Sequence, residues 1–286
     1  MLFDPRIHSA QQLVKSFLGR IEQLRGGLRY GANELIVLNY HSVPKKFTAR
    51  FKEQVDFLTR HYNIIDPSKL GSYFKGDLRT DRTSLLFTFD DGLKNNLNAA
   101  RVLDEKKIKA LFFIVPSFID TPKDEQKKFY LKNIRPVVNS RIDHEEEDFC
   151  ALSWRDLADM AGKGHAIGAH TLTHTLVAAN SSHENSEREI VACKKKIEDR
   201  LLVTVDAFCS INNTLVSVGV KEKNLIEKNY RYHFTTLPGY NSVKKDALFI
   251  KRRNVECYWS TGSFFYALGN SDLKRWQKRI EEYDSL

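Results

Sequence analysis

Short apolar runs alternate with amphipathic segments along most of the chain. The strongest runs, LIVLNY at 35–40, SLLFTF at 84–89 and ALFFIV at 110–115, predict buried strands because they are rich in branched and aromatic residues. Weaker strand candidates of the same kind lie at 165–169, 205–209, 231–235 and 247–251. Apolar residues at helical spacing predict helices over 47–62, 93–107, 154–163, 186–202, 216–229 and 273–283.

This alternation predicts an α/β fold with a parallel sheet, either closed into a barrel or doubly wound. About seven strand candidates, and no G-x-G-x-x-G after the first, favour a distorted (β/α) barrel of parallel strands. We expect a single barrel domain over 31–286, preceded by a helical extension over 1–30. A charged, irregular stretch near 117–150 predicts a loop insertion in the barrel.

Two adjacent acids, Asp90 and Asp91, directly follow the buried run SLLFTF, where a carboxylate without a partner is costly. Neighbouring side chains on an extended backbone point in opposite directions, so both can face one site only if the chain bends. Gly92 allows a tight turn at this point. One acid could then bind a metal and the other act as a base; alternatively, Asp91 caps the helix that follows.

His170 and His174 follow another strand candidate, and their i, i+4 spacing would place both on one face of a helical turn. In parallel α/β folds, the carboxyl ends of the strands meet at one face, where active sites form. Asp91, His170 and His174 would together make a catalytic zinc-type site with one position open for water.

His41 also follows a strand candidate, so it is a candidate general acid at the same face, unless it simply bonds a loop carbonyl. Of the other histidines, His144 and His183 lie in polar stretches and are expected in solvent. His233 is expected to be packed, and His165 begins a strand at the opposite end.

Composition favours an ordinary globular protein, with 42% hydrophobic and 28% charged residues. The N-terminal stretch has no signal-peptide pattern, and no apolar run has the length of a transmembrane helix. Four widely spaced cysteines favour free thiols over two disulfides. We therefore expect a cytoplasmic protein, with peripheral membrane contact as an alternative. The net charge of +9 is scattered, apart from short clusters at 194–196 and 251–253, and favours a solvated basic surface over a nucleic-acid partner.

The motifs TFDDG and, about eighty residues later, HTLTH resemble those of the polysaccharide deacetylases, the NodB-homology group of carbohydrate esterase family 4. The stretch from Leu152-Ser153-Trp154 to the histidine motif is also similar. The resemblance implies that Asp90 is the catalytic base and that Asp91, His170 and His174 bind the metal. It also implies a distorted barrel of about seven strands.

The run VLNYHSV at 37–43 resembles the start of a permuted subgroup found among surface-glycan enzymes, which implies that His41 is the general acid. One segment departs from the family: AFCSINN at 207–213 replaces the usual Arg-x-Pro-Tyr motif and lacks the arginine that orients the base. The amide that stabilises the oxyanion is then expected from 210–212.

The sequence thus predicts a metal-dependent hydrolase that removes an N-acetyl group from a sugar, in a polysaccharide or its nucleotide- or lipid-linked precursor. Zinc is the expected metal, with iron, cobalt and nickel as alternatives. The candidate substrate-binding residues are Tyr40, Trp154, Ser210 and Asn212. Three alternatives remain: a non-hydrolytic glycan-binding or assembly protein, a sugar O-acetyl esterase and an N-deformylase.

Overall fold

The computed structural model describes residues 31–78, 80–135, 144–177, 181–211, 220–244 and 247–269. The predicted N-terminal helical extension and the predicted helix at 273–283 lie outside these residues. None of the helices in the described ranges is long and apolar enough to cross a bilayer.

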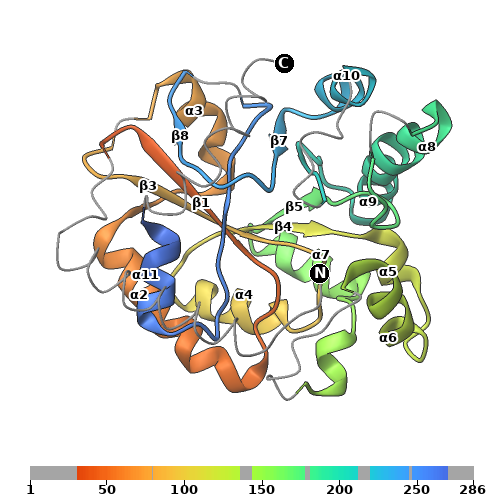
Figure 1. Cartoon of the computed structure of the whole chain (residues 1–286), viewed down its shortest axis with the longest axis horizontal. Coiled ribbons are helices and arrows are strands. Elements are labelled where there is room, and N and C mark those ends of the chain that lie inside the picture. Colours follow the sequence, from red (N-terminus) through yellow and green to blue (C-terminus); the bar gives the residue numbers. More distant parts are fainter. Residues whose placement is uncertain are drawn as a thin grey trace, which may run out of the picture.

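The centre of the fold is a curled, mostly parallel sheet in the strand order β7-β6-β5-β4-β3-β1-β8, with β2 beside β3 and β9 beside β1 (Figure 1). All its pairings are parallel except that of β1 with β8. The strands are β1(Glu34–Tyr40), β2(Asn63–Ile64), β3(Ser84–Phe89), β4(Leu111–Ile114), β5(Ala166–Ala169), β6(Ala207–Cys209), β7(Tyr232–Phe234), β8(Asn241–Ser242) and β9(Arg253–Asn254). The predicted distorted (β/α) barrel is therefore confirmed.

The gap between β7 and β1 is closed by the segment 250–254. Ile250 bridges to Phe234 of β7, and β9 pairs in parallel with β1 three residues later. The strand predicted at 247–251 is therefore reduced to a single bridge, because the chain crosses from β7 to β1 within a few residues. Arg252 lies at the centre of this crossing.

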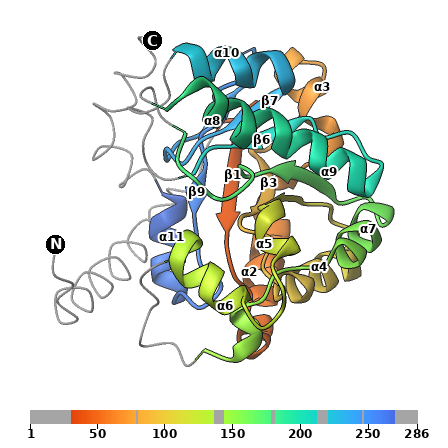
Figure 2. The same ribbon diagram turned by 90° about the vertical axis from the view of Figure 1, so that its right-hand side faces the viewer.

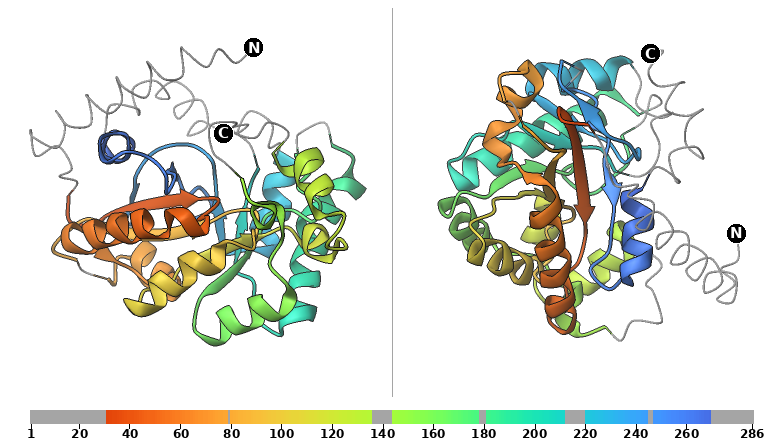
Figure 3. Two further views of the ribbon diagram at one scale, coloured as in Figure 1. Left: turned by 90° about the horizontal axis from the view of Figure 1, so that it is seen from below. Right: turned by 90° about the vertical axis from the view of Figure 1, so that its left-hand side faces the viewer.

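Helices surround the sheet. They are α2(Thr48–His61), α3(Leu70–Lys75), α4(Asn96–Glu105), α5(Pro116–Asp120), α6(Gln126–Phe129), α7(Trp154–Gly162), α8(His183–Glu187), α9(Cys193–Leu201), α10(Val220–Asn229) and α11(Thr261–Leu268). Helices α8, α9 and α10 lie along one side of the sheet (Figure 2), and α2 lies beside α4 (Figure 3). The stretch near 117–150 holds α5 and α6, so it is less irregular than its composition predicted.

The central strands β1, β3 and β4 are almost entirely buried on both faces, as expected for a sheet covered by helices. In β3, Leu85, Phe87 and Phe89 pack under the outer helices, whereas Leu86 belongs to the inner cluster with Val37 and Phe113. Because side chains alternate along a strand, the register that turns Leu86 inward also turns Asp90 inward, at the end of the same strand.

Helix α7 begins as its sequence predicted. The Ser153 hydroxyl accepts a hydrogen bond from the Asp156 amide at 3.1 Å, and the Asp156 carboxylate accepts one from the Ser153 amide at 2.8 Å. This reciprocal capping box satisfies two amides that the helix cannot bond itself. It fixes where α7, the helix that precedes β5, starts.

Gly168 of β5 has no room for a side chain. A Cβ there would lie 2.6 Å from the buried ring of Phe113 and 3.2 Å from the carbonyl oxygen of Ala207. We expect Gly168→Ala to lower the free energy of unfolding, measured by urea denaturation, by about 1–3 kcal/mol through overpacking. The control Gly162→Ala adds a methyl with no atom within 4 Å, and should raise stability by about 0.5–1 kcal/mol. Equal stabilities for the two variants would contradict this account.

Candidate active site

The carboxyl ends of three parallel strands bring the candidate residues to one edge of the sheet. His41 follows β1, Asp90 and Asp91 follow β3, and His170 follows β5. His41, from the turn after β1, contributes to lowering the pKa of both acids in the turn after β3. The strand-end rule therefore located these residues correctly.

The chain bends sharply at Asp91, which has a φ of +74°, and continues through Gly92 at +69°. A Cβ on Gly92 would meet Ile114 at 3.2 Å, so glycine is favoured both by conformation and by space. The bend turns both acids toward the same site. Helix α4 begins only at Asn96, so Asp91 is not its cap.

Asp91, His170 and His174 form a compact set of metal-ligand atoms. The Asp91 Oδ1 lies 3.6 Å from Nε2 of His170 and 3.5 Å from Nε2 of His174, and the three donors lie within 4.8 Å of one another. These separations suit three ligands around one divalent cation.

Both histidines are oriented for metal binding by backbone carbonyls. The Nδ1 of His170 lies 3.0 Å from the carbonyl oxygen of Cys209, and the Nδ1 of His174 lies 2.7 Å from that of Asn133. A carbonyl can only accept, so each Nδ1 carries the hydrogen and donates it. In a neutral ring this leaves the Nε2 lone pair for a metal. The donor set therefore fits a divalent cation.

The pKa shifts of Asp91 and His170 favour an ionised carboxylate and a neutral ring, whereas that of His174 favours the protonated ring. Burial opposes ionisation of Asp91, but the hydrogen bond from His174 and the nearby histidines hold its pKa well below the usual range. Burial also lowers the pKa of His170 and so favours the neutral ring. For His174 burial acts in the same direction, but the bond to Asp91 outweighs it and raises the pKa. A cation bound here would replace that proton.

The loop that carries the two histidines is not the predicted helical turn. Thr171 and His174 both have a φ of +60°, a left-handed conformation that threonine rarely adopts. The two rings nevertheless lie 5.2 Å apart between centroids. The i, i+4 spacing was informative, but the rings meet through a strained loop rather than through helix geometry.

Arg252, from the segment 250–254, lies beside Asp90 and supplies the arginine that the segment 207–213 lacks, which corrects the prediction that no arginine orients this acid. Its guanidinium donates two hydrogen bonds to the carboxylate of Asp90, at 2.7 and 2.8 Å, and both side chains are almost fully buried. Burial alone would raise the pKa of Asp90, but Arg252 and His170 hold it below its usual range. Arg252 belongs to the basic cluster at 251–253, which was expected on the surface.

His41 is partly exposed, with 23% of its side chain accessible, and faces a buried carboxylate that sequence reasoning missed. Its Nδ1 lies 3.9 Å from Oε1 of Glu256, which also lies 3.7 Å from the guanidinium of Arg135. Asn96 donates a hydrogen bond to the backbone carbonyl of His41 and so fixes the strand end. Because Arg135 lies beside Glu256, the stretch 117–150 contributes a residue to the site.

The predicted substrate-binding residues have mixed positions. Tyr40 is fully buried, stacks on Phe89 and donates to Gln54, so the prediction that it contacts a sugar is corrected to a core role. Trp154 is partly buried on α7, where its indole nitrogen donates to Asp120. Ser210 lies at the end of β6, and Asn212 lies outside the described residues.

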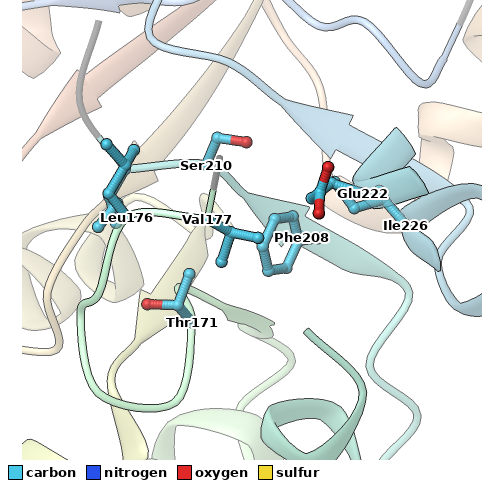
Figure 4. A pocket seen from close by; sticks show the side chains of 8 residues that line it. Thr171, Leu176, Val177, Phe208, Ser210, Glu222 and Ile226 are labelled. Atoms are coloured by element: carbon cyan, nitrogen blue, oxygen red, sulfur yellow. The ribbon is translucent and has the colours of Figure 1, made fainter. Parts of the chain in front are cut away.

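Ser210 and Thr171 line a narrow pocket between β6, α10 and the histidine loop (Figure 4). The Ser210 hydroxyl is 2.6 Å from Nε2 of His233, and its amide donates to the carbonyl of Phe234. Its amide is therefore engaged in the sheet and does not point to an oxyanion. Burial lowers the pKa of His233 to about 4, in agreement with a packed, neutral ring.

We expect the buried ion pair of Asp90 and Arg252 to contribute strongly to the free energy of unfolding. Arg252→Met would leave the carboxylate buried without its counter-charge and should cost about 3–5 kcal/mol of unfolding free energy, measured by urea denaturation. The control Lys52→Met breaks an exposed pair with Glu105 and should change stability by less than about 1 kcal/mol. A cost for Arg252→Met no larger than for the control would show that the pair is not the stabilising contact.

Comparison with known proteins agrees with this geometry. Residues 77–211 match the family model described as polysaccharide deacetylase. A search of curated proteins gave no match. Among solved structures, the chain is similar to a polysaccharide deacetylase from Bacillus cereus, with 22% identity and a TM-score of 0.59, covering 83% of this chain and 69% of the other.

Two further structures share the fold. The deacetylase PplD of Streptococcus pyogenes, in complex with acetate, has 15% identity and a TM-score of 0.62, covering 82% of this chain and 98% of the other. A de-N-acetylase from Aggregatibacter actinomycetemcomitans has 15% identity and a TM-score of 0.60, covering 80% and 98%. The matched family model spans the strand-end acids and both histidines, so this part of the chain is similar to the polysaccharide deacetylases.

Proposed function

We propose that this protein is a divalent-metal-dependent deacetylase that hydrolyses the N-acetyl group of a sugar. The observation that carries the proposal is the set of Asp91, His170 and His174, with both imidazoles oriented by carbonyls, next to an Asp90 that is kept ionised. A cation held by these three residues would polarise the acetyl carbonyl and acidify a water molecule.

Asp90 is the proposed general base. It is ionised, and its carboxylate is fixed by the two bonds from Arg252, so little reorganisation is needed when it takes a proton from the attacking water. The same bonds weaken its basicity, because a neighbouring cation stabilises the charged form. The arrangement therefore fixes the orientation of the Asp90 carboxylate and does not raise its pKa.

His41 is the proposed general acid, which donates a proton to the departing nitrogen. It lies at the neighbouring strand end, and part of its ring is accessible to substrate. The buried carboxylate of Glu256 lies 3.9 Å from Nδ1 of His41 and would help to orient the ring. Arg135 beside Glu256 would hold the carboxylate in place.

Two of the structural neighbours suggest the substrate class, since one is a de-N-acetylase and another holds acetate. Zinc is the proposed metal, because the set of two imidazoles and one carboxylate is typical of catalytic zinc; iron, cobalt and nickel are the alternatives. We further propose a nucleotide- or lipid-linked sugar in the cytoplasm as substrate, with which the net charge of +9 is compatible.

A second candidate is a metal-binding protein that holds a glycan without hydrolysing it. One observation favours it: the amide of Ser210, at the expected position of the oxyanion donor, is bonded to Phe234 instead. Such a protein would retain metal and glycan affinity but release no acetate.

Acetate release from a panel of N-acetylated sugars tests the proposal. With metal present, we expect the wild type to release acetate, a chelator to abolish release, and zinc or cobalt to restore it. Asp90→Asn should lower kcat by about 100- to 10,000-fold, with metal affinity retained, because the base is lost but the three ligands remain. His41→Gln should also lower kcat without changing metal affinity.

The control Asp199→Asn removes an exposed carboxylate on α9 and should leave kcat unchanged. Full acetate release by Asp90→Asn would exclude Asp90 as the base. A wild type that binds metal and glycan but releases no acetate from any sugar would support the non-hydrolytic alternative.

A further inference from the structure

The loop between His170 and His174 needs outside contacts to keep its shape. Two of its residues, Thr171 and His174, have left-handed backbones, and strain of this kind persists only where the surroundings impose it. Asp91 can meet both imidazoles only while this shape holds. Thr173 lies directly before the strained His174.

Glu189, in the helical segment after the loop, accepts two hydrogen bonds from Thr173. Its Oε2 accepts a hydrogen bond from the Thr173 amide at 2.9 Å, and its Oε1 accepts one from the Thr173 hydroxyl at 2.9 Å. The side chain of Glu189 is fully buried. Apart from Arg188, whose guanidinium donates to Oε1 at 3.2 Å, these are its hydrogen-bond partners among the described residues. A buried carboxylate is costly, so its two bonds to one loop residue are a specific feature.

Glu189 is itself held on a rigid, irregular turn. It lies in a π-helical turn, Arg188–Ala192, between α8 and α9, and such turns often mark functional positions in helices. The hydroxyl of Tyr230 donates to the carbonyl of Ile190 in this turn at 2.6 Å. The turn is thereby anchored, and the carboxylate is presented from a fixed support.

We propose that Glu189 is a positioning residue that sets the metal affinity of the site by holding the histidine loop in its strained shape. It contacts Thr173 rather than a metal ligand, while the carbonyl of Asn133 holds His174 from the other side. This inference rests on the proposed metal site. It adds Glu189 as the residue that keeps His170 and His174 close to Asp91.

Metal binding by Glu189→Ala tests the proposal. Without the carboxylate the Thr173 amide loses its partner, and we expect zinc and cobalt to bind 10- to 100-fold more weakly, as is common when a partner outside the ligand shell is removed. Affinity is measured by competition with a chromophoric chelator. The cobalt-loaded variant should also show a changed visible absorption spectrum, and excess metal should restore part of kcat.

Two variants separate positioning from a general loss of stability. Glu222→Ala removes another buried glutamate, on α10, which bonds the Ser186 hydroxyl at 2.8 Å and not the histidine loop. It should lower the melting temperature without changing metal affinity or the cobalt spectrum. Glu189→Gln should keep most of the affinity, because its amide oxygen can still accept from the Thr173 amide.

Wild-type affinity and an unchanged spectrum in folded Glu189→Ala would overturn the proposal, as would an equal loss of affinity in Glu222→Ala. If Glu189→Ala does not fold, Thr173→Val decides. It removes one of the two bonds and should weaken metal binding about three-fold, whereas unchanged binding would overturn the proposal. A wild type that binds no metal would instead overturn the proposed metal site itself.

Discussion

The buried ion pair between Asp90 and Arg252 is the interaction on which the barrel and the site both depend. Moving two charges out of water is costly, and the cost is offset only when the remaining donors are satisfied. Here the guanidinium also donates to Asn39 of β1, to the carbonyl of Thr235 after β7 and to the sulfur of Cys209 in β6. One side chain thus ties β6 and the end of β7 to β1 across the curled sheet, and the same contacts fix the carboxylate of Asp90.

Much of the fold and of the site could be predicted because it depends on local patterns. Alternating apolar runs located the strands, and apolar spacing over 154–163 predicted the start of α7. Asp90 and Asp91 were found because two acids at the end of a buried strand require an explanation. The convergence of strand ends then placed them with His41 and His170, without any knowledge of which strands pair.

The remaining features depend on contacts between distant parts of the chain. Arg252 was read as part of a basic surface cluster, since nothing in its neighbourhood shows that the chain crosses there from β7 to β1. Glu189 looked like an ordinary charge on an amphipathic helix, and Asn133 lay in a stretch taken for an insertion. The left-handed backbone conformations of Thr171 and His174 could not be predicted either, because glycine is the residue that usually indicates such a conformation in a sequence.

The late position of Arg252 has a consequence for how the protein is made. Asp90, Asp91 and both histidines are synthesised well before residue 252, so an emerging chain carries the proposed metal ligands before Asp90 has its counter-charge. Chains fold from the N-terminus as they are synthesised, and pairings between distant segments form slowly. The arrival of the segment 250–254 would therefore close the barrel and give Asp90 its counter-charge in one late step.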